Sequence, residues 1–111
     1  MKLTAEILDA MAREIVEEVH PQKILLFGSQ ARGDAREDSD VDLMVVCEGA
    51  FGGTVEPRRA LGTRLQHRLG RFKVSKDILL FTEREFNEWK GEQNHCIGRA
   101  AREGRLLYER P

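Results

Sequence analysis

Two apolar runs enclose a polar stretch that begins with Gly28-Ser29 and ends with Asp40-Val41-Asp42. The runs at 24–27 and 43–46 have the length and composition of buried strands. Residues two apart on a strand share a face, so the two carboxylates project together beside a Gly-Ser turn whose backbone N–H groups can hold an anion. Paired carboxylates next to a phosphate cradle equip a protein for metal-assisted nucleotidyl transfer. The stretch therefore predicts a chain that binds a nucleoside triphosphate.

The composition indicates one cytoplasmic globular domain over residues 1–111. Of the 111 residues, 41% are hydrophobic and 33% are charged, which is typical of a domain with a single packed core. No apolar run is long enough for a transmembrane helix, and the residues after Met1 lack a signal-peptide block, so we expect no membrane association and no export. Cys47 and Cys96 have no C-x-x-C partner, which indicates free thiols in a reducing compartment. The net charge of −1 argues against direct binding of nucleic acid.

Periodicity and turn residues predict an α/β (α+β) sandwich, with a mixed sheet of three or four strands flanked by helices. We expect helices over 4–19 and 55–71, and a third that starts near Glu83, breaks around Gly91 and ends at Gly104. Strands are expected over 23–27, 40–47 and 74–81, with the first in a central position because its apolar run is unbroken. Residues 28–39 are expected to form a loop, and 106–108 a short last strand or a packed tail.

The expected catalytic and metal-binding side chains are Asp40, Asp42 and a third carboxylate from a neighbouring strand, for which Asp77 is the candidate. Mg²⁺ takes oxygen ligands, and in a two-metal site one ion activates the acceptor hydroxyl while the other binds the leaving pyrophosphate. For the nucleotide we expect Gly28 to allow close backbone approach, Ser29 to bind a phosphate oxygen and the loop residue Arg32 to pair with phosphate.

The stretch from Gly28 to Leu43 resembles the signature of the DNA polymerase β-like nucleotidyltransferase superfamily. Within it, the chain is similar to the minimal nucleotidyltransferases, many of which are antitoxins encoded beside HEPN-domain toxins. The likeness extends over a leading helix, the signature, the later strand with Lys76-Asp77-Ile78 and the ending from Arg102 to Glu109. It implies a small nucleotidyltransferase fold that uses Mg²⁺ and ATP. It also implies metal ligation by Asp40, Asp42 and Asp77, and phosphate binding by Gly28 and Ser29.

In that family the enzyme transfers AMP from ATP to a tyrosine hydroxyl of its HEPN ribonuclease and silences it. The resemblance thus implies a HEPN-type toxin as partner, in a hetero-oligomer. Two alternatives stay open. The chain could neutralise its partner by binding without turnover, or it could modify a small molecule or RNA with the help of a separate subunit.

Several other residues admit an ordinary structural explanation. Arg64, Arg68 and Arg71 belong either to a solvated helix face or to a docking surface for an acidic partner or a nucleotide. His67 could act as a general base only if it lay near Asp42, and we do not expect this role. His95, Cys96 and Cys47 lack the spacing of zinc ligands, so we expect them to pack in the core. Phe86 and Trp89 are expected in the core, and an exposed one would be an interface anchor.

Overall fold

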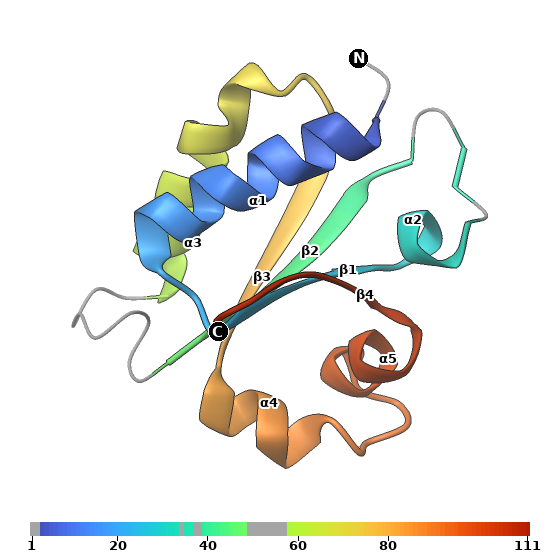
Figure 1. Cartoon of the computed structure of the whole chain (residues 1–111). Coiled ribbons are helices and arrows are strands. Elements are labelled where there is room, and N and C mark those ends of the chain that lie inside the picture. Colours follow the sequence, from blue (N-terminus) through green and yellow to red (C-terminus); the bar gives the residue numbers. More distant parts are fainter. Residues whose placement is uncertain (1–2, 34, 37–38, 49–57) are drawn as a thin grey trace.

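The computed structural model describes residues 3–33, 35–36, 39–48 and 58–111. Its centre is a four-stranded mixed sheet in the order β3-β2-β1-β4 (Figure 1). β1 (Lys23–Phe27) is antiparallel to both of its neighbours, β2 (Val41–Cys47) and β4 (Arg105–Glu109), whereas β3 (Lys76–Thr82) runs parallel to β2. The predicted fold class and the central position of β1 are therefore confirmed.

The first face of the sheet is covered by α1 (Ala5–Val19) and α3 (Arg58–Arg68) (Figure 1). α1 begins where predicted, because the Thr4 hydroxyl accepts a hydrogen bond from the Ile7 N–H at 3.2 Å. It ends at His20, which adopts a left-handed conformation with φ 47° ahead of Pro21. The apolar stripe of α1 packs into the larger of two core clusters, together with inward residues of β1 and β2 and two leucines of α3. This layer is the main hydrophobic core.

The second face carries α4 (Glu83–Trp89) and α5 (Cys96–Glu103) over a smaller core cluster (Figure 1). α4 starts with the predicted capping box, in which the Glu85 N–H donates to Thr82 Oγ1 and the Thr82 N–H donates to Glu85 Oε1. Side chains alternate along β2, so Met44 and Val46 face this cluster while Val45 faces the first. By the same alternation Asp42, the second residue of β2, lies on the second face.

Several expected boundaries were wrong, and one of them is the start of β2, which lies at Val41 rather than Asp40. Residues 28–39 are not all loop, because α2 (Ser29–Arg32) forms a single turn of helix that ends at Gly33 with φ 84°. α3 stops at Arg68 and continues as a 3-10 turn, η1 (Leu69–Arg71), while residues 55–57 lie outside the described part of the chain. β3 begins at Lys76 rather than Val74, because residues 72–75 form a turn whose carbonyls accept hydrogen bonds from the Lys76 ammonium.

The structure of the last third of the chain agrees with the expectations from the sequence. The helical region breaks between α4 and α5, and the second segment ends at Gly104 as expected. The alternative left open for 106–108 is resolved, since these residues belong to strand β4. Among the described residues, no helix is long and apolar enough to cross a membrane.

Candidate nucleotide-binding site

The turn between β1 and α2 brings the backbone against a carboxylate. Gly28 has φ 74°, and its carbonyl accepts hydrogen bonds from the N–H groups of Ala31 and Arg32, both at 3.1 Å. A Cβ atom at this position would lie 2.3 Å from Asp42 Oδ2. Only glycine satisfies both the positive φ and this close approach. The predicted Gly-Ser turn and the predicted aspartate therefore meet in the structure.

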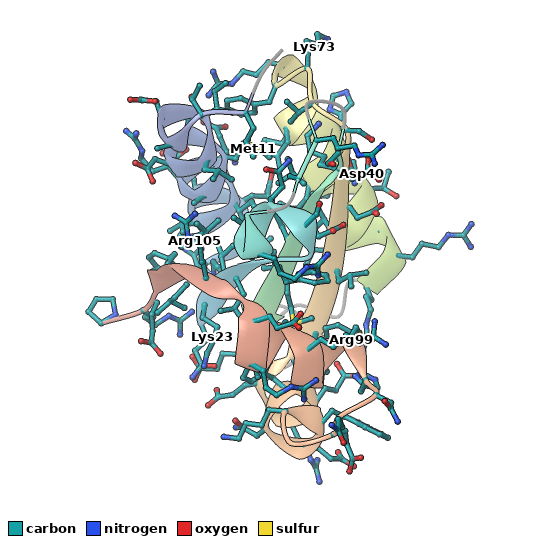
Figure 2. All side chains as sticks on the ribbon, turned by 90° about the vertical axis from the view of Figure 1, so that its right-hand side faces the viewer. Met11, Lys23, Asp40, Lys73, Arg99 and Arg105 are labelled. Atoms are coloured by element: carbon teal, nitrogen blue, oxygen red, sulfur yellow. The ribbon has the colours of Figure 1, made fainter. Side chains whose placement is uncertain are left out.

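Strand register places Asp77 next to Asp42. The two residues are direct partners in the parallel β2–β3 pair, so their side chains leave the same face of the sheet. Asp40 precedes β2 by one residue, and the neighbouring Val41 N–H donates to the Ser75 carbonyl at 2.8 Å, which ties this segment to the start of β3. Figure 2 shows Asp40 beside β3 at the end of the sheet where α2 lies. Asp42 is half-buried, whereas Asp40 and Asp77 are exposed.

The electrostatics of this end of the sheet are those of an unneutralised acidic cluster. Burial raises the pKa of Asp42 above its ordinary value, the negative charges of Asp77 and Asp40 raise it further, and a hydrogen bond with Asp77 acts in the same direction. The positive charge of Arg32 opposes them by lowering the Asp42 pKa. Carboxylates that repel one another at a partly desolvated position provide a strong reason for a cation to bind.

The donor set suits Mg²⁺. Carboxylate oxygens are its preferred protein ligands, and the ion commonly takes one or two of them together with substrate phosphates and water. Asp42 and Asp77 supply such a pair, with Asp40 next to them. Within the described residues no three His, Cys, Asp or Glu side chains stand close enough to bind one ion by themselves. The remaining ligands would have to come from phosphate oxygens and water, as is usual for this ion.

Arg32 occupies a position that the sequence did not fully anticipate. Its guanidinium lies 3.8 Å from a carboxylate oxygen of Glu103 in α5, and both side chains are about half exposed. Glu103 was not among the expected site residues, because 71 positions separate the two and no local pattern links them. Arg32 is nevertheless close enough to lower the Asp42 pKa. Phosphate pairing by Arg32 and by Ser29, the first residue of α2, stays a prediction.

The basic residues of α3 and η1 have partners within the chain. Arg68 contacts Glu14, Glu17 and Glu18 of α1, Arg64 pairs with Glu18, and Arg71 reaches Glu14 at 3.4 Å. We call these six residues the α1–α3 ion-pair network. The sequence left open a solvated face or a docking surface for these arginines, and in the structure they pair with glutamates of α1 instead. The spacing of the three glutamates along one face of α1 was the available signal.

The other polar candidates serve packing and capping. His67 is exposed on α3, which covers the face of the sheet opposite to Asp42. His95 caps α5 by accepting a hydrogen bond from the Ile97 N–H at 3.0 Å. Cys47 is buried in the larger core, and burial raises the pKa of its thiol to about 11. Phe86 is in the core as predicted, but Trp89 is 40% exposed and stacks on the His95 ring, so a core position for Trp89 was wrong.

Residues 8–103, which include the Gly-Ser turn and all three aspartates, match the family model described as the nucleotidyltransferase domain. The chain belongs to this family. It is therefore a nucleotidyltransferase, and membership of the family implies a nucleoside triphosphate as substrate. It is also 34% identical over 90 residues to a candidate protein adenylyltransferase of Methanocaldococcus jannaschii, with 78% of each chain covered.

Two crystal structures share the fold of this nucleotidyltransferase. One is a candidate nucleotidyltransferase from Sulfolobus solfataricus, with TM-score 0.56 and 24% identity, over 93% of this chain and 81% of that one. The other is a toxin-antitoxin structure with AMP-PNP, with TM-score 0.54 and 18% identity, over 92% of this chain and 73% of that one. At these identities the likeness concerns the arrangement of helices and strands.

Proposed function

We propose that this nucleotidyltransferase transfers AMP from ATP to a tyrosine hydroxyl of a HEPN-type toxin and thereby acts as its antitoxin. The observation that carries the proposal is the adjacency of Asp42 and Asp77 on one face, with the Gly28 backbone against Asp42. Two further findings support a protein acceptor and an adenylyl donor. The Methanocaldococcus relative is described as a candidate protein adenylyltransferase, and one structure with this fold is a toxin-antitoxin structure with an ATP analogue.

In the proposed reaction the acceptor hydroxyl oxygen forms a bond to the α-phosphorus of ATP. The bond from that phosphorus to the oxygen bridging to the β-phosphate breaks, its electron pair leaves with pyrophosphate, and the hydroxyl proton passes to solvent. Asp42 and Asp77, with Asp40 beside them, would hold Mg²⁺ together with phosphate oxygens and water, and the ion when bound would neutralise the triphosphate and activate the acceptor oxygen. Gly28 would admit a phosphate close to the backbone, and Ser29 and Arg32 would contact phosphate oxygens.

The exposure of the site favours a large acceptor. Asp40 and Asp77 are exposed at the end of the sheet, and only Asp42 is half-buried between them. The described part of the chain leaves Asp40 and Asp77 accessible to solvent. A hydroxyl on the surface of another protein can therefore approach the pair without any opening of the fold.

The test is AMP transfer measured by intact-mass spectrometry. The purified chain is incubated with Mg²⁺, ATP and the product of the neighbouring gene. We expect the partner to gain about 329 Da, the mass of one AMP group, or a multiple of it. Asp42→Asn should abolish the gain, while Asp9→Asn, an exposed acid on α1 remote from the site, should leave it unchanged. An unmodified partner in a tight complex would favour neutralisation by binding alone.

A further inference from the structure

The outer edge of β3 has backbone hydrogen-bonding groups directed away from the sheet. Among the described strands, β3 stands at the edge of the sheet and pairs with β2 (Figure 2). Because the Val41 N–H donates to the Ser75 carbonyl, the odd-numbered residues of β3 bond to β2 and the even-numbered ones point outward. The Lys76 carbonyl confirms this phase, since it accepts a hydrogen bond from the Gln66 side chain of α3 at 3.1 Å.

Among the residues that the structure describes, two along this edge, the partly exposed Ile78 and the buried Leu80, have unpaired outward backbone groups. Ile78 and Leu80 direct their N–H and C=O groups outward, and within the described part of the chain no hydrogen bond engages these groups on that side. Exposed edges of this kind are templates for another strand. Gln66 already occupies the equivalent carbonyl of Lys76, so the open segment begins at Ile78, one residue after Asp77.

A groove of about 300 Å³ lies along the same segment, lined by residues 78–81 and by Arg58, Arg59 and Gly62 of α3. Gly62 lines the groove without a side chain that would fill it. Close packing does not force a glycine at this position. A Cβ atom there would lie 3.5 Å from Leu80 Cδ1, which is an ordinary contact. Glycine inside a helix is less favourable than alanine by about 1 kcal/mol. Gly62 therefore lowers the stability of α3 at a position where a larger side chain would narrow the groove.

Two arginines line the groove. Arg58 contacts both carboxylate oxygens of Glu85, at 2.9 and 2.8 Å, and lies over the Phe81 ring. Arg59 is exposed, and among the described residues it makes no ion pair. Arg59 therefore presents a positive charge to the groove. An extended segment that carries acidic side chains complements this surface, whereas a basic one would be repelled.

We infer that the acceptor protein presents an extended acidic segment that pairs with Ile78 and Leu80 as an additional strand on β3. Because strand residues rise about 3.3 Å each, a segment docked there continues past Asp77 within one or two residues. A hydroxyl on that continuation reaches the carboxylate pair. The backbone supplies the register, and Arg59 supplies the preference for acidic sequences. This inference rests on the proposed function, which it extends from the reaction to the substrate segment.

The test uses two 12-residue peptides with alternating β-branched and charged side chains and one tyrosine, one peptide acidic and the other with lysine at the charged positions. We expect the acidic peptide to slow amide hydrogen exchange at Ile78 and Leu80 in the wild-type chain, and the lysine peptide to leave it unchanged. Arg59→Glu should weaken binding of the acidic peptide about tenfold, and Gly62→Gln should weaken it by filling the groove. Arg99→Glu, an exposed arginine of α5, serves as the matched control.

Unchanged exchange at Ile78 and Leu80 would overturn the inference, and so would equal weakening by Arg59→Glu and Arg99→Glu. Slowed exchange that rises with the concentration of the chain alone would assign the edge to a second copy and would also overturn it. These outcomes are separate from the proposed function. Docking at the edge without AMP on any tyrosine would contradict AMP transfer, whereas AMP transfer with an unaffected edge would contradict the docking.

Discussion

Two clusters of charged residues in this protein are built from similar side chains and behave in opposite ways. In the α1–α3 ion-pair network, glutamates of one helix meet arginines of another, and hydrogen bonds to Arg68 and Arg64 hold the pKa values of Glu14 and Glu18 below their ordinary range. At the candidate site, burial and two neighbouring carboxylates raise the pKa of Asp42. The network stabilises the fold it belongs to. At the site, the folded chain holds carboxylates together although their negative charges repel one another.

Strand pairing explains how the repelling cluster persists. Asp42 and Asp77 are adjacent because β2 and β3 share seven register positions, from Val41–Lys76 to Cys47–Thr82, so the apolar strand residues fix the position of both acids. The network has the opposite origin, since its side chains are long, partly solvated and brought together by their own attraction. A cation bound at such a site relieves the repulsion between the carboxylates, and this relief adds to the free energy of cation binding.

The largest expected effect comes from removing one charge at the site. Asp42→Asn should reduce AMP transfer by about a thousandfold or more, because it removes a ligand of the proposed metal. The same variant should be more stable than the wild type in metal-free buffer. We expect a gain of about 0.5 kcal/mol, a small figure because the carboxyl is still partly solvated. Thermal unfolding with a chelator present checks the second expectation, and a less stable variant would contradict it.

Gly28→Ala should affect both activity and stability. The new Cβ would collide with Asp42 Oδ2 and the backbone would keep an unfavourable φ, so we expect a loss of about 1–3 kcal/mol in the free energy of unfolding and a large loss of activity. Gly33→Ala is the matched control, because Gly33 also has positive φ but a Cβ there would meet nothing within 4 Å. The difference between the two variants in urea unfolding measures the contact with Asp42. Equal effects would show that this contact does not matter.

Arg68→Ala should break the network and leave the chemistry intact. It removes contacts to three glutamates at once, and we expect the melting temperature to fall by a few degrees with AMP transfer per folded molecule unchanged. Arg99→Ala provides the comparison, since Arg99 is exposed on α5 and belongs to neither cluster. The fall should shrink when salt is added, because the ion pairs are largely at the surface. Loss of AMP transfer in folded Arg68→Ala would contradict this expectation, because it would show that the ion-pair network affects the candidate site.

The smallest expected effect is a difference in pH dependence. The depressed pKa values of Glu14 and Glu18 mean that their stabilisation is present above the ordinary value of 4.5 and is lost as pH falls through the lowered values. For Asp42 the sign is reversed. Its penalty is present above the raised pKa and is relieved as pH falls towards 3.8. The stability gain of Asp42→Asn over wild type should therefore disappear below about pH 4, which unfolding curves at successive pH values can test.

The sequence predicted the elements that depend on local pattern. Thr4, the Thr82–Glu85 capping box and the apolar run of β1 each produced the expected structure, because caps and buried strands are encoded within a few residues. The helical turn after Gly28 was missed, since four residues are too few to show periodicity. Contacts between distant residues were missed for a different reason. The Arg32–Glu103 pair and the α1–α3 ion-pair network arise only when helices meet across the fold.

For the candidate site, the sequence placed the Gly-Ser turn and the paired carboxylates together, and the structure adds their spatial relation. Register makes Asp77 the neighbour of Asp42, which composition and spacing could suggest but not establish. The close approach of the Gly28 backbone to Asp42 required coordinates. The roles of the expected site residues all stay predictions, and the variants above test two of them, Gly28 and Asp42.

The most direct measurement compares the melting temperatures of the wild type and Asp42→Asn, each with chelator alone and with Mg²⁺ plus a non-hydrolysable ATP analogue. If the acidic cluster is a metal–nucleotide site, the variant melts higher than the wild type in chelator, and the analogue with Mg²⁺ raises only the wild type. A wild type that the analogue does not stabilise, or a variant that it stabilises equally, would contradict the assignment of Asp42 to such a site.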